Sequence, residues 1–138
     1  RGAYDAGGKS VGLNIRLKHE QHINHYVTES EDFSYFFARK TMLSLASQLC
    51  IFFPGGYGTL DELFDILTRI QTEKIPQVPV ILIGKTYWTP LTAWMEEYLY
   101  RRHRAVDRKD IALYYTADDA DEAYRLIRRL IKKKKVPL

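Results

Sequence analysis

Hydrophobic and polar positions along the chain follow two alternating patterns. Short apolar runs rich in β-branched residues, such as residues 80–83 (VILI), are typical of buried strands. Longer segments with apolar residues three or four positions apart, such as residues 59–72, are typical of amphipathic helices. The pattern predicts strands at residues 11–17, 49–53, 80–83 and 111–115, helices at residues 33–49, 59–72, 89–100 and 118–132, and a loop at residues 19–32. Because strands and helices alternate, we expect an α/β fold with a parallel sheet covered on both faces.

The length of 138 residues suits one domain. We expect that domain to span residues 1–131, followed by a basic tail at residues 132–138. Residues 1–8, RGAYDAGG, are typical of the last turns of a helix closed by glycine. We therefore expect the chain to be the C-terminal portion of a larger domain, whose N-terminal part is missing.

A glycine-rich loop follows one of the predicted strands. Residues 50–53 form an apolar run that breaks at Pro54, opens into residues 55–58 and leads directly into a helical pattern. Glycines let backbone N–H groups approach a ligand closely, and a helix N-terminus favours negative charge, so this order is typical of a phosphate site. The loop lacks both the Gly-Lys-Ser/Thr ending of a Walker A loop and the G-x-G-x-x-G spacing of a dinucleotide site.

Glu62, in the helix after this loop, has two interpretations. Thr59 and Glu62 fit a capping box, in which Thr59 is the N-cap and Glu62 reaches back to its N–H group. Alternatively, Glu62 is a carboxylate that acts on a ligand bound at the loop. The local sequence leaves both open.

Arg39 lies near the middle of an apolar helix face, and Lys40 lies at its edge. The apolar members of that face are Tyr35, Met42, Leu43, Ala46 and Leu49. A cation directed into an apolar face needs a partner, since an unpaired buried charge is strongly destabilising. That partner is either an internal carboxylate or a bound phosphate, which suits guanidinium geometry.

The expected topology favours the phosphate. A helix that leads into a strand runs antiparallel to it, so the half that carries Arg39 lies near the carboxyl end of the next strand. The glycine loop begins at that end, where ligands of open parallel sheets bind. We therefore expect Arg39 to lie near the loop.

Composition and charge limit the classes of function. The formal net charge is +4, but its basic runs, residues 101–104 and 132–135, are interpreted as a solvated helix end and a tail, so nucleic-acid binding is not expected. Cys50 is the single cysteine; it can form no intramolecular disulfide, and its predicted strand makes it a core residue. No apolar stretch reaches the roughly eighteen residues of a membrane span, and we expect a cytoplasmic protein without a membrane partner.

The segment Pro54 to Glu62, PGGYGTLDE, resembles the PGGxGTxxE signature of the Lonely Guy (LOG) family. Arg39 and Lys40 resemble that family's Arg-Lys pair, at the expected distance upstream. The resemblance covers nearly the whole chain, including the opening RGAYDAGGKSVGLNI. The family was long mislabelled as lysine decarboxylase, but nothing in this sequence resembles a pyridoxal-phosphate lysine site.

The resemblance implies a Rossmann-like three-layer fold and a nucleoside 5′-monophosphate phosphoribohydrolase. Such an enzyme releases the free base and ribose 5-phosphate from AMP or from a cytokinin nucleotide. The resemblance assigns catalysis to Arg39 and Glu62. It assigns the nucleotide site to Lys40, Gly55, Gly56, Tyr57, Gly58, Thr59, Leu60 and Asp61, with Thr68 and Glu20 as weaker assignments. It also implies no metal or other cofactor, and a homodimer or larger homo-oligomer with the site near a subunit interface.

Two other functions stay open at this point. The chain is alternatively a non-catalytic nucleotide-binding or carrier protein of the same fold, although the presence of Arg39 and Glu62 favours the enzyme. A nucleic-acid-associated module would rely on the basic C-terminus and would bind in a steeply salt-dependent way. The sequence leaves open the preferred base, the oligomer size, and whether Arg39 holds the phosphate or assists the departing base.

Overall fold

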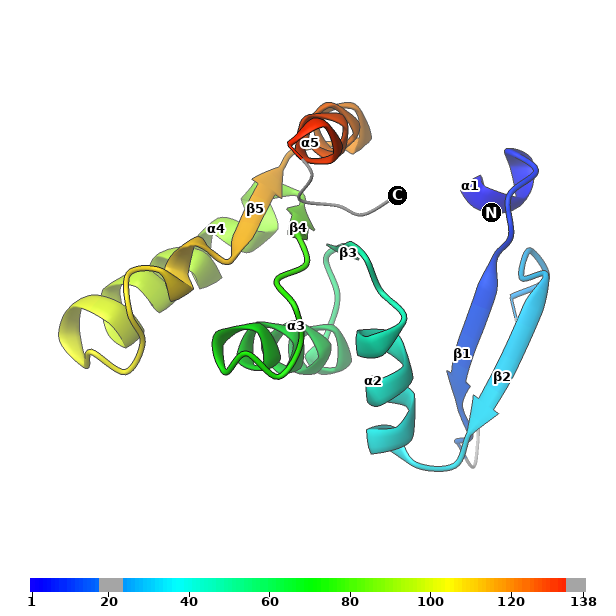
Figure 1. Cartoon of the computed structure of the whole chain (residues 1–138), viewed down its shortest axis with the longest axis horizontal. Coiled ribbons are helices and arrows are strands. Elements are labelled where there is room, and N and C mark those ends of the chain that lie inside the picture. Colours follow the sequence, from blue (N-terminus) through cyan, green and yellow to red (C-terminus); the bar gives the residue numbers. More distant parts are fainter. Residues whose placement is uncertain (18–23, 134–138) are drawn as a thin grey trace. The chain divides into compact units, whose positions relative to one another are not determined.

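A computed structural model describes residues 1–17 and 24–133 of the chain. The chain divides into two compact units, Arg1–Ala46 and Ser47–Leu138, and each is described here by itself. Both units contain parallel strands and helices, and in the second unit the two alternate along the chain, as expected for an α/β, Rossmann-like fold (Figure 1). The expectation of one domain over residues 1–131 stays a prediction.

The first unit is a two-stranded parallel sheet with two helices. Its elements are α1 (Gly2–Asp5), β1 (Val11–Ile15), β2 (Glu29–Phe33) and α2 (Phe36–Leu45). The prediction of a loop over residues 19–32 is wrong for its last residues, which form β2. This strand, ESEDF, is mostly exposed and carries no apolar alternation. Its backbone pairing with β1 and the hydrogen bond from Asn14 Nδ2 to Asp32 Oδ1 (3.2 Å) hold it instead.

The second unit contains a three-stranded parallel sheet in the order β3-β4-β5. Its strands are β3 (Cys50–Phe52), β4 (Val80–Ile83) and β5 (Tyr114–Ala117), and its helices are α3 (Tyr57–Gln71), α4 (Lys85–Trp94), the π-helix η1 (Met95–Arg102), the 3₁₀ helix η2 (Asp110–Ala112) and α5 (Ala120–Lys132). The central strand β4 is buried along its whole length, as in other parallel sheets.

Helices cover both faces of this sheet. Val80 and Leu82 of β4 belong to a core cluster with the apolar face of α3 and with Trp88 of α4. Ile81 and Ile83 point to the other face and pack with Ala123 of α5, since successive strand side chains alternate. Figure 1 accordingly shows α3 and α5 on opposite sides of β4. The predicted parallel sheet with two covered faces is confirmed in this unit.

Two elements of the second unit begin three or more residues away from their predicted starts. The sequence pattern predicts a strand at residues 111–115, but η2 occupies Asp110–Ala112 and β5 begins at Tyr114. Ile111 and Leu113 are apolar because they pack against the core cluster of α3, not because they lie in a strand. The helix expected from residue 89 begins at Lys85, directly after β4, and Pro90 lies inside it.

Cys50 lies in β3, half-buried against the core. Burial raises the pKa of its thiol, despite an opposing hydrogen bond with Ser47. A raised pKa leaves little reactive thiolate at neutral pH, which agrees with the expected packing role.

The C-terminus of α3 ends in a Schellman motif with a glutamate where glycine is usual. Glu73 N donates to Ile70 O (3.1 Å) and Lys74 N donates to Arg69 O (2.9 Å), the two bonds of that motif. Glu73 has a φ of 56°, which is the left-handed region. A residue with a Cβ atom is strained there.

We expect replacement of Glu73 with glycine to stabilise the protein. The relief of left-handed strain exceeds the added entropy of the unfolded chain, for a net gain of about 0.5–1 kcal/mol. Urea unfolding followed by circular dichroism measures this gain. Glu73→Ala is the matched control, because it removes the same carboxylate but keeps Cβ, and equal stability of the two variants would contradict the prediction.

Candidate functional site

The glycine loop connects β3 to α3 in the predicted order of strand, loop and helix. β3 ends at Phe52, and α3 begins at Tyr57 with Gly56 as its N-cap. The first N–H groups of a helix have no partner within it, so they are donors for an anion at this position. Tyr57 is 93% exposed. The start of α3 is therefore accessible from solvent.

Gly55 and its neighbours have different surroundings. A Cβ atom added to Gly55 would lie 2.1 Å from Thr59 Oγ1 and 2.8 Å from Thr59 Cβ. At Gly56 and Gly58 an added Cβ would meet nothing within 4 Å. Thr59 thus closes the loop at Gly55, whereas the space beside Gly56 and Gly58 is open.

The capping-box interpretation of Glu62 is wrong. It needs Thr59 as the N-cap, but Gly56 occupies that position and Thr59 is the third residue of the helix. Glycine is itself a good N-cap residue, and the Thr59 side chain packs against Gly55 instead. Glu62 is half-buried on the helix face that also carries Gly58 and Thr59, because residues three and four apart share a face.

Arg39 and Lys40 lie in α2 of the first unit and are both half-buried. Arg39 Nε donates to Leu13 O of β1 at 2.7 Å. This contact fixes the guanidinium against the sheet of its own unit through a backbone carbonyl. The glycine loop belongs to the other unit, so the expected proximity of Arg39 to the loop stays a prediction.

The remaining predicted site residues are not all at the loop. Leu60 is half-buried and packs against the core, whereas Asp61 is exposed. Thr68 lines an apolar cavity of about 190 Å³ with Met95 and Leu99. It lies twelve positions from Gly56, or about 18 Å along the helix axis, so one small group cannot contact both. Glu20 lies outside the described residues.

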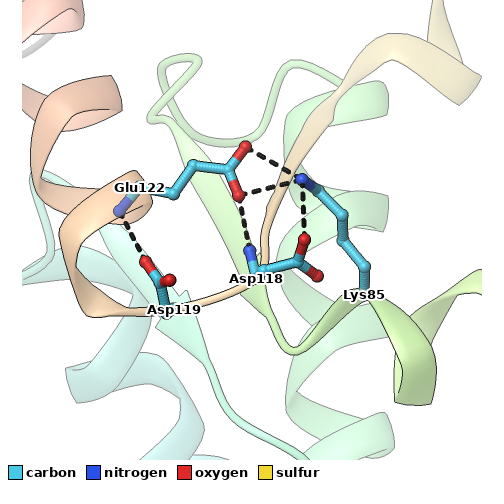
Figure 2. A network of polar contacts seen from close by, with 4 residues as sticks. All are labelled: Lys85, Asp118, Asp119 and Glu122. Carbon is cyan, nitrogen blue, oxygen red and sulfur yellow. Dashed lines mark hydrogen bonds and ion pairs between the residues drawn. The ribbon is translucent and has the colours of Figure 1, made fainter.

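The carboxyl ends of β4 and β5 are joined by a polar network (Figure 2). Lys85 Nζ donates to both carboxylate oxygens of Glu122, at 2.9 and 2.8 Å, and to Asp118 Oδ2 at 3.3 Å. Glu122 Oε2 also accepts from Asp118 N (2.7 Å), while Asp119 Oδ1 caps α5 by accepting from Glu122 N (2.8 Å). The network therefore fixes the start of α4 to the start of α5 at the edge of the sheet where the loop lies.

The chain was compared with protein families. The family described as "Possible lysine decarboxylase" matches residues 1–127, which is most of the chain. This is the LOG family. The chain belongs to it. Comparison with curated proteins gives no match.

Membership of the LOG family suggests a phosphoribohydrolase, and LOG proteins are generally enzymes. The LOG signature of this chain falls on the loop and the first half of α3.

Within residues 1–17 and 24–133, no cluster of three or more His, Cys, Asp or Glu side chains is placed to hold a metal ion. None of the helices in the described part of the chain is long and apolar enough to cross a membrane.

Two residues near the LOG loop were missed by sequence reasoning. Tyr87 of α4 donates from Oη to the carbonyl oxygen of Gly55 (2.5 Å). Lys85, the first residue of α4, anchors the start of that helix through its ion pair with Glu122. The sequence does indicate the position of these two residues, because Gly84 directly follows the apolar run of β4 and so marks the end of that strand. In a parallel sheet, the residues after β4 and the residues after β3 meet at the same edge.

We expect the network of Lys85 and Glu122 to make stability depend on pH. The hydrogen bond from Lys85 is the largest cause that lowers the pKa of Glu122 below its ordinary value of 4.5. Because the pKa of Glu122 is lower in the folded state, its ionised carboxylate stabilises the folded protein at pH values above the unfolded-state pKa. This contribution is lost as the pH falls through the folded-state pKa.

Replacement of Lys85 with methionine should therefore destabilise the protein slightly at neutral pH. The difference in the free energy of unfolding between this variant and the wild type should shrink as the pH falls below about 4.5. Urea unfolding at a series of pH values measures this difference, with Lys74→Met, at an exposed lysine, as the control. A difference that does not change with pH would contradict the prediction.

Proposed function

We propose that this LOG protein is a nucleoside 5′-monophosphate phosphoribohydrolase. The observation that supports the proposal is the open glycine loop at the start of α3, with Glu62 on the same helix face as Gly58 and Thr59. A glycine loop at a helix N-terminus favours a phosphate, and the Glu62 carboxylate lies within one and a half helical turns of it. The family match over residues 1–127 is consistent with this chemistry.

In the proposed reaction, the bond between C1′ of the ribose and the base nitrogen breaks, and the base leaves with the bonding electrons. Water adds at C1′ and gives ribose 5-phosphate, while a proton goes to the departing base. The transition state resembles an oxocarbenium ion, so the Glu62 carboxylate stabilises the positive ribose or activates the water. Arg39 and Lys40 supply positive charge for the phosphate or the departing base.

The proposed substrate is AMP or an N6-modified, cytokinin-type AMP, and the proposed assembly is a homodimer or larger. Thr68 and Glu20 remain proposed substrate contacts. Because Thr68 is far from the loop of its own chain, its contribution fits a site near a subunit interface, where it approaches the loop of a partner copy.

The experiment is incubation of the full chain with AMP, GMP, CMP, UMP and N6-isopentenyl AMP, and chromatographic measurement of free base and ribose 5-phosphate. Adenosine, which lacks the phosphate, is the control. Release of base from the nucleotides and not from adenosine supports the proposal, and the ranking of substrates gives the preferred base. Nucleotide binding without base release supports the non-catalytic nucleotide-binding alternative instead.

A further inference from the structure

Tyr87 has a fixed position at the start of α4. Its ring packs edge-on against the ring of Trp88, with centroids 4.8 Å apart and planes at 84°. Trp88 is fully buried, and its Nε1 donates to Ile83 O at 3.0 Å. The Tyr87 ring is therefore held by a side chain that is itself anchored to β4.

The start of α4 lies against the glycine loop. Gly84, its N-cap, has a φ of 95°, and a Cβ atom added there would lie 3.4 Å from Pro54 Cγ. Gly84 N donates to Ala117 O of β5 at 2.8 Å, which fixes the turn between β4 and α4. This close approach brings the hydroxyl of Tyr87 to the loop, where Oη donates to Gly55 O.

The peptide between Gly55 and Gly56 is a single planar unit. In a trans peptide the C=O and the following N–H point in opposite directions, so a group that holds the Gly55 carbonyl also sets the direction of the Gly56 N–H. Two adjacent glycines otherwise leave this peptide free to rotate as a unit, because neither has a Cβ atom to restrict it. The side of the loop at Gly56 is open.

We propose that Tyr87 is a positioning residue of the nucleotide site, which holds the Gly55–Gly56 peptide so that the Gly56 amide points toward the substrate phosphate. This inference rests on the proposed function for the identity of the anion. The Tyr87 hydroxyl does not contact the phosphate; it acts through the peptide. Its contribution is to binding, equally in the ground state and the transition state, and so it lowers KM without changing kcat.

The test is Tyr87→Phe, which removes the hydroxyl and keeps the ring against Trp88. The probe is ribose 5-phosphate, which the proposed reaction does not consume, titrated into ¹⁵N-labelled full chain while the Gly56 amide signal is followed by NMR. Tyr124→Phe, at a 61% exposed tyrosine of α5, is the matched control. The KM and kcat for the preferred nucleotide are measured on the same three proteins.

In the wild type and in the Tyr124 control, ribose 5-phosphate is expected to shift the Gly56 amide. In Tyr87→Phe, affinity should fall about tenfold with a smaller Gly56 shift, and KM should rise about tenfold with kcat within about twofold. Equal affinity of Tyr87→Phe and the wild type for ribose 5-phosphate overturns the inference. The inference is also overturned if ribose 5-phosphate does not shift the NMR signal of the Gly56 amide in the wild type. A Tyr87-dependent Gly56 shift without base release from any nucleotide supports the inference and refutes the proposed function.

Discussion

Replacement of Glu62 with glutamine is expected to lower kcat for base release by about 10²- to 10⁴-fold. Glutamine has nearly the same shape, but it can neither carry negative charge beside an oxocarbenium-like ribose nor accept a proton from water. The fold should tolerate the exchange, because Glu62 is the sixth residue of α3 and the helix starts from Gly56 without it. The measurements are kcat on AMP and the thermal unfolding curve of the same preparation.

Glu73→Gln is the matched control for this prediction. It makes the same exchange of carboxylate for amide at an exposed position just after the end of α3, far from the loop. Its kcat should equal that of the wild type. If Glu62→Gln keeps more than a tenth of the wild-type kcat, the carboxylate takes no part in the chemical step, and the proposed mechanism has to be abandoned.

The parts of the fold that could be predicted are the elements whose own hydrophobic pattern indicates their secondary structure. β4 is four apolar residues in a row because it is buried on both faces, and its predicted bounds are confirmed. β2 gave no such signal, because its polar residues are held by a neighbouring strand through backbone hydrogen bonds. The apolar residues at 111 and 113 gave a misleading signal, because burial against α3 does not require a strand.

The same distinction applies to the candidate site. The glycine loop was predictable, because its composition is unusual and its flanking strand and helix are local. The capping pattern places the N-cap at Thr59, three residues after the observed N-cap at Gly56, because the contact of Thr59 with Gly55 cannot be read from such a pattern. The bond from Tyr87 to Gly55 joins residues 32 positions apart. This bond depends on the pairing of β3 with β4, and the order of strands in the sheet cannot be read from the hydrophobic pattern.

The contact between Gly55 and Thr59 also makes a strong prediction for Gly55→Ala. The added methyl group would lie 2.1 Å from Thr59 Oγ1, which is closer than real atoms allow, so the loop or the first turn of α3 must shift. Overpacking of this kind costs about 1–3 kcal/mol of stability. Because the shift occurs in the loop proposed to bind the phosphate, we also expect at least a tenfold loss of affinity for ribose 5-phosphate, measured by calorimetry.

Gly58→Ala provides the opposite result from the same exchange three residues later. Its added methyl group meets nothing within 4 Å, and Gly58 lies inside the first turn of α3. Alanine in a helix is favoured over glycine by about 0.5–1 kcal/mol, so this variant should unfold at a higher urea concentration than the wild type. Gly55→Ala combined with Thr59→Ala removes the contact with Oγ1 and should recover part of the lost stability. Without such recovery, the destabilisation of Gly55→Ala would have to arise from the backbone of the loop and not from Thr59.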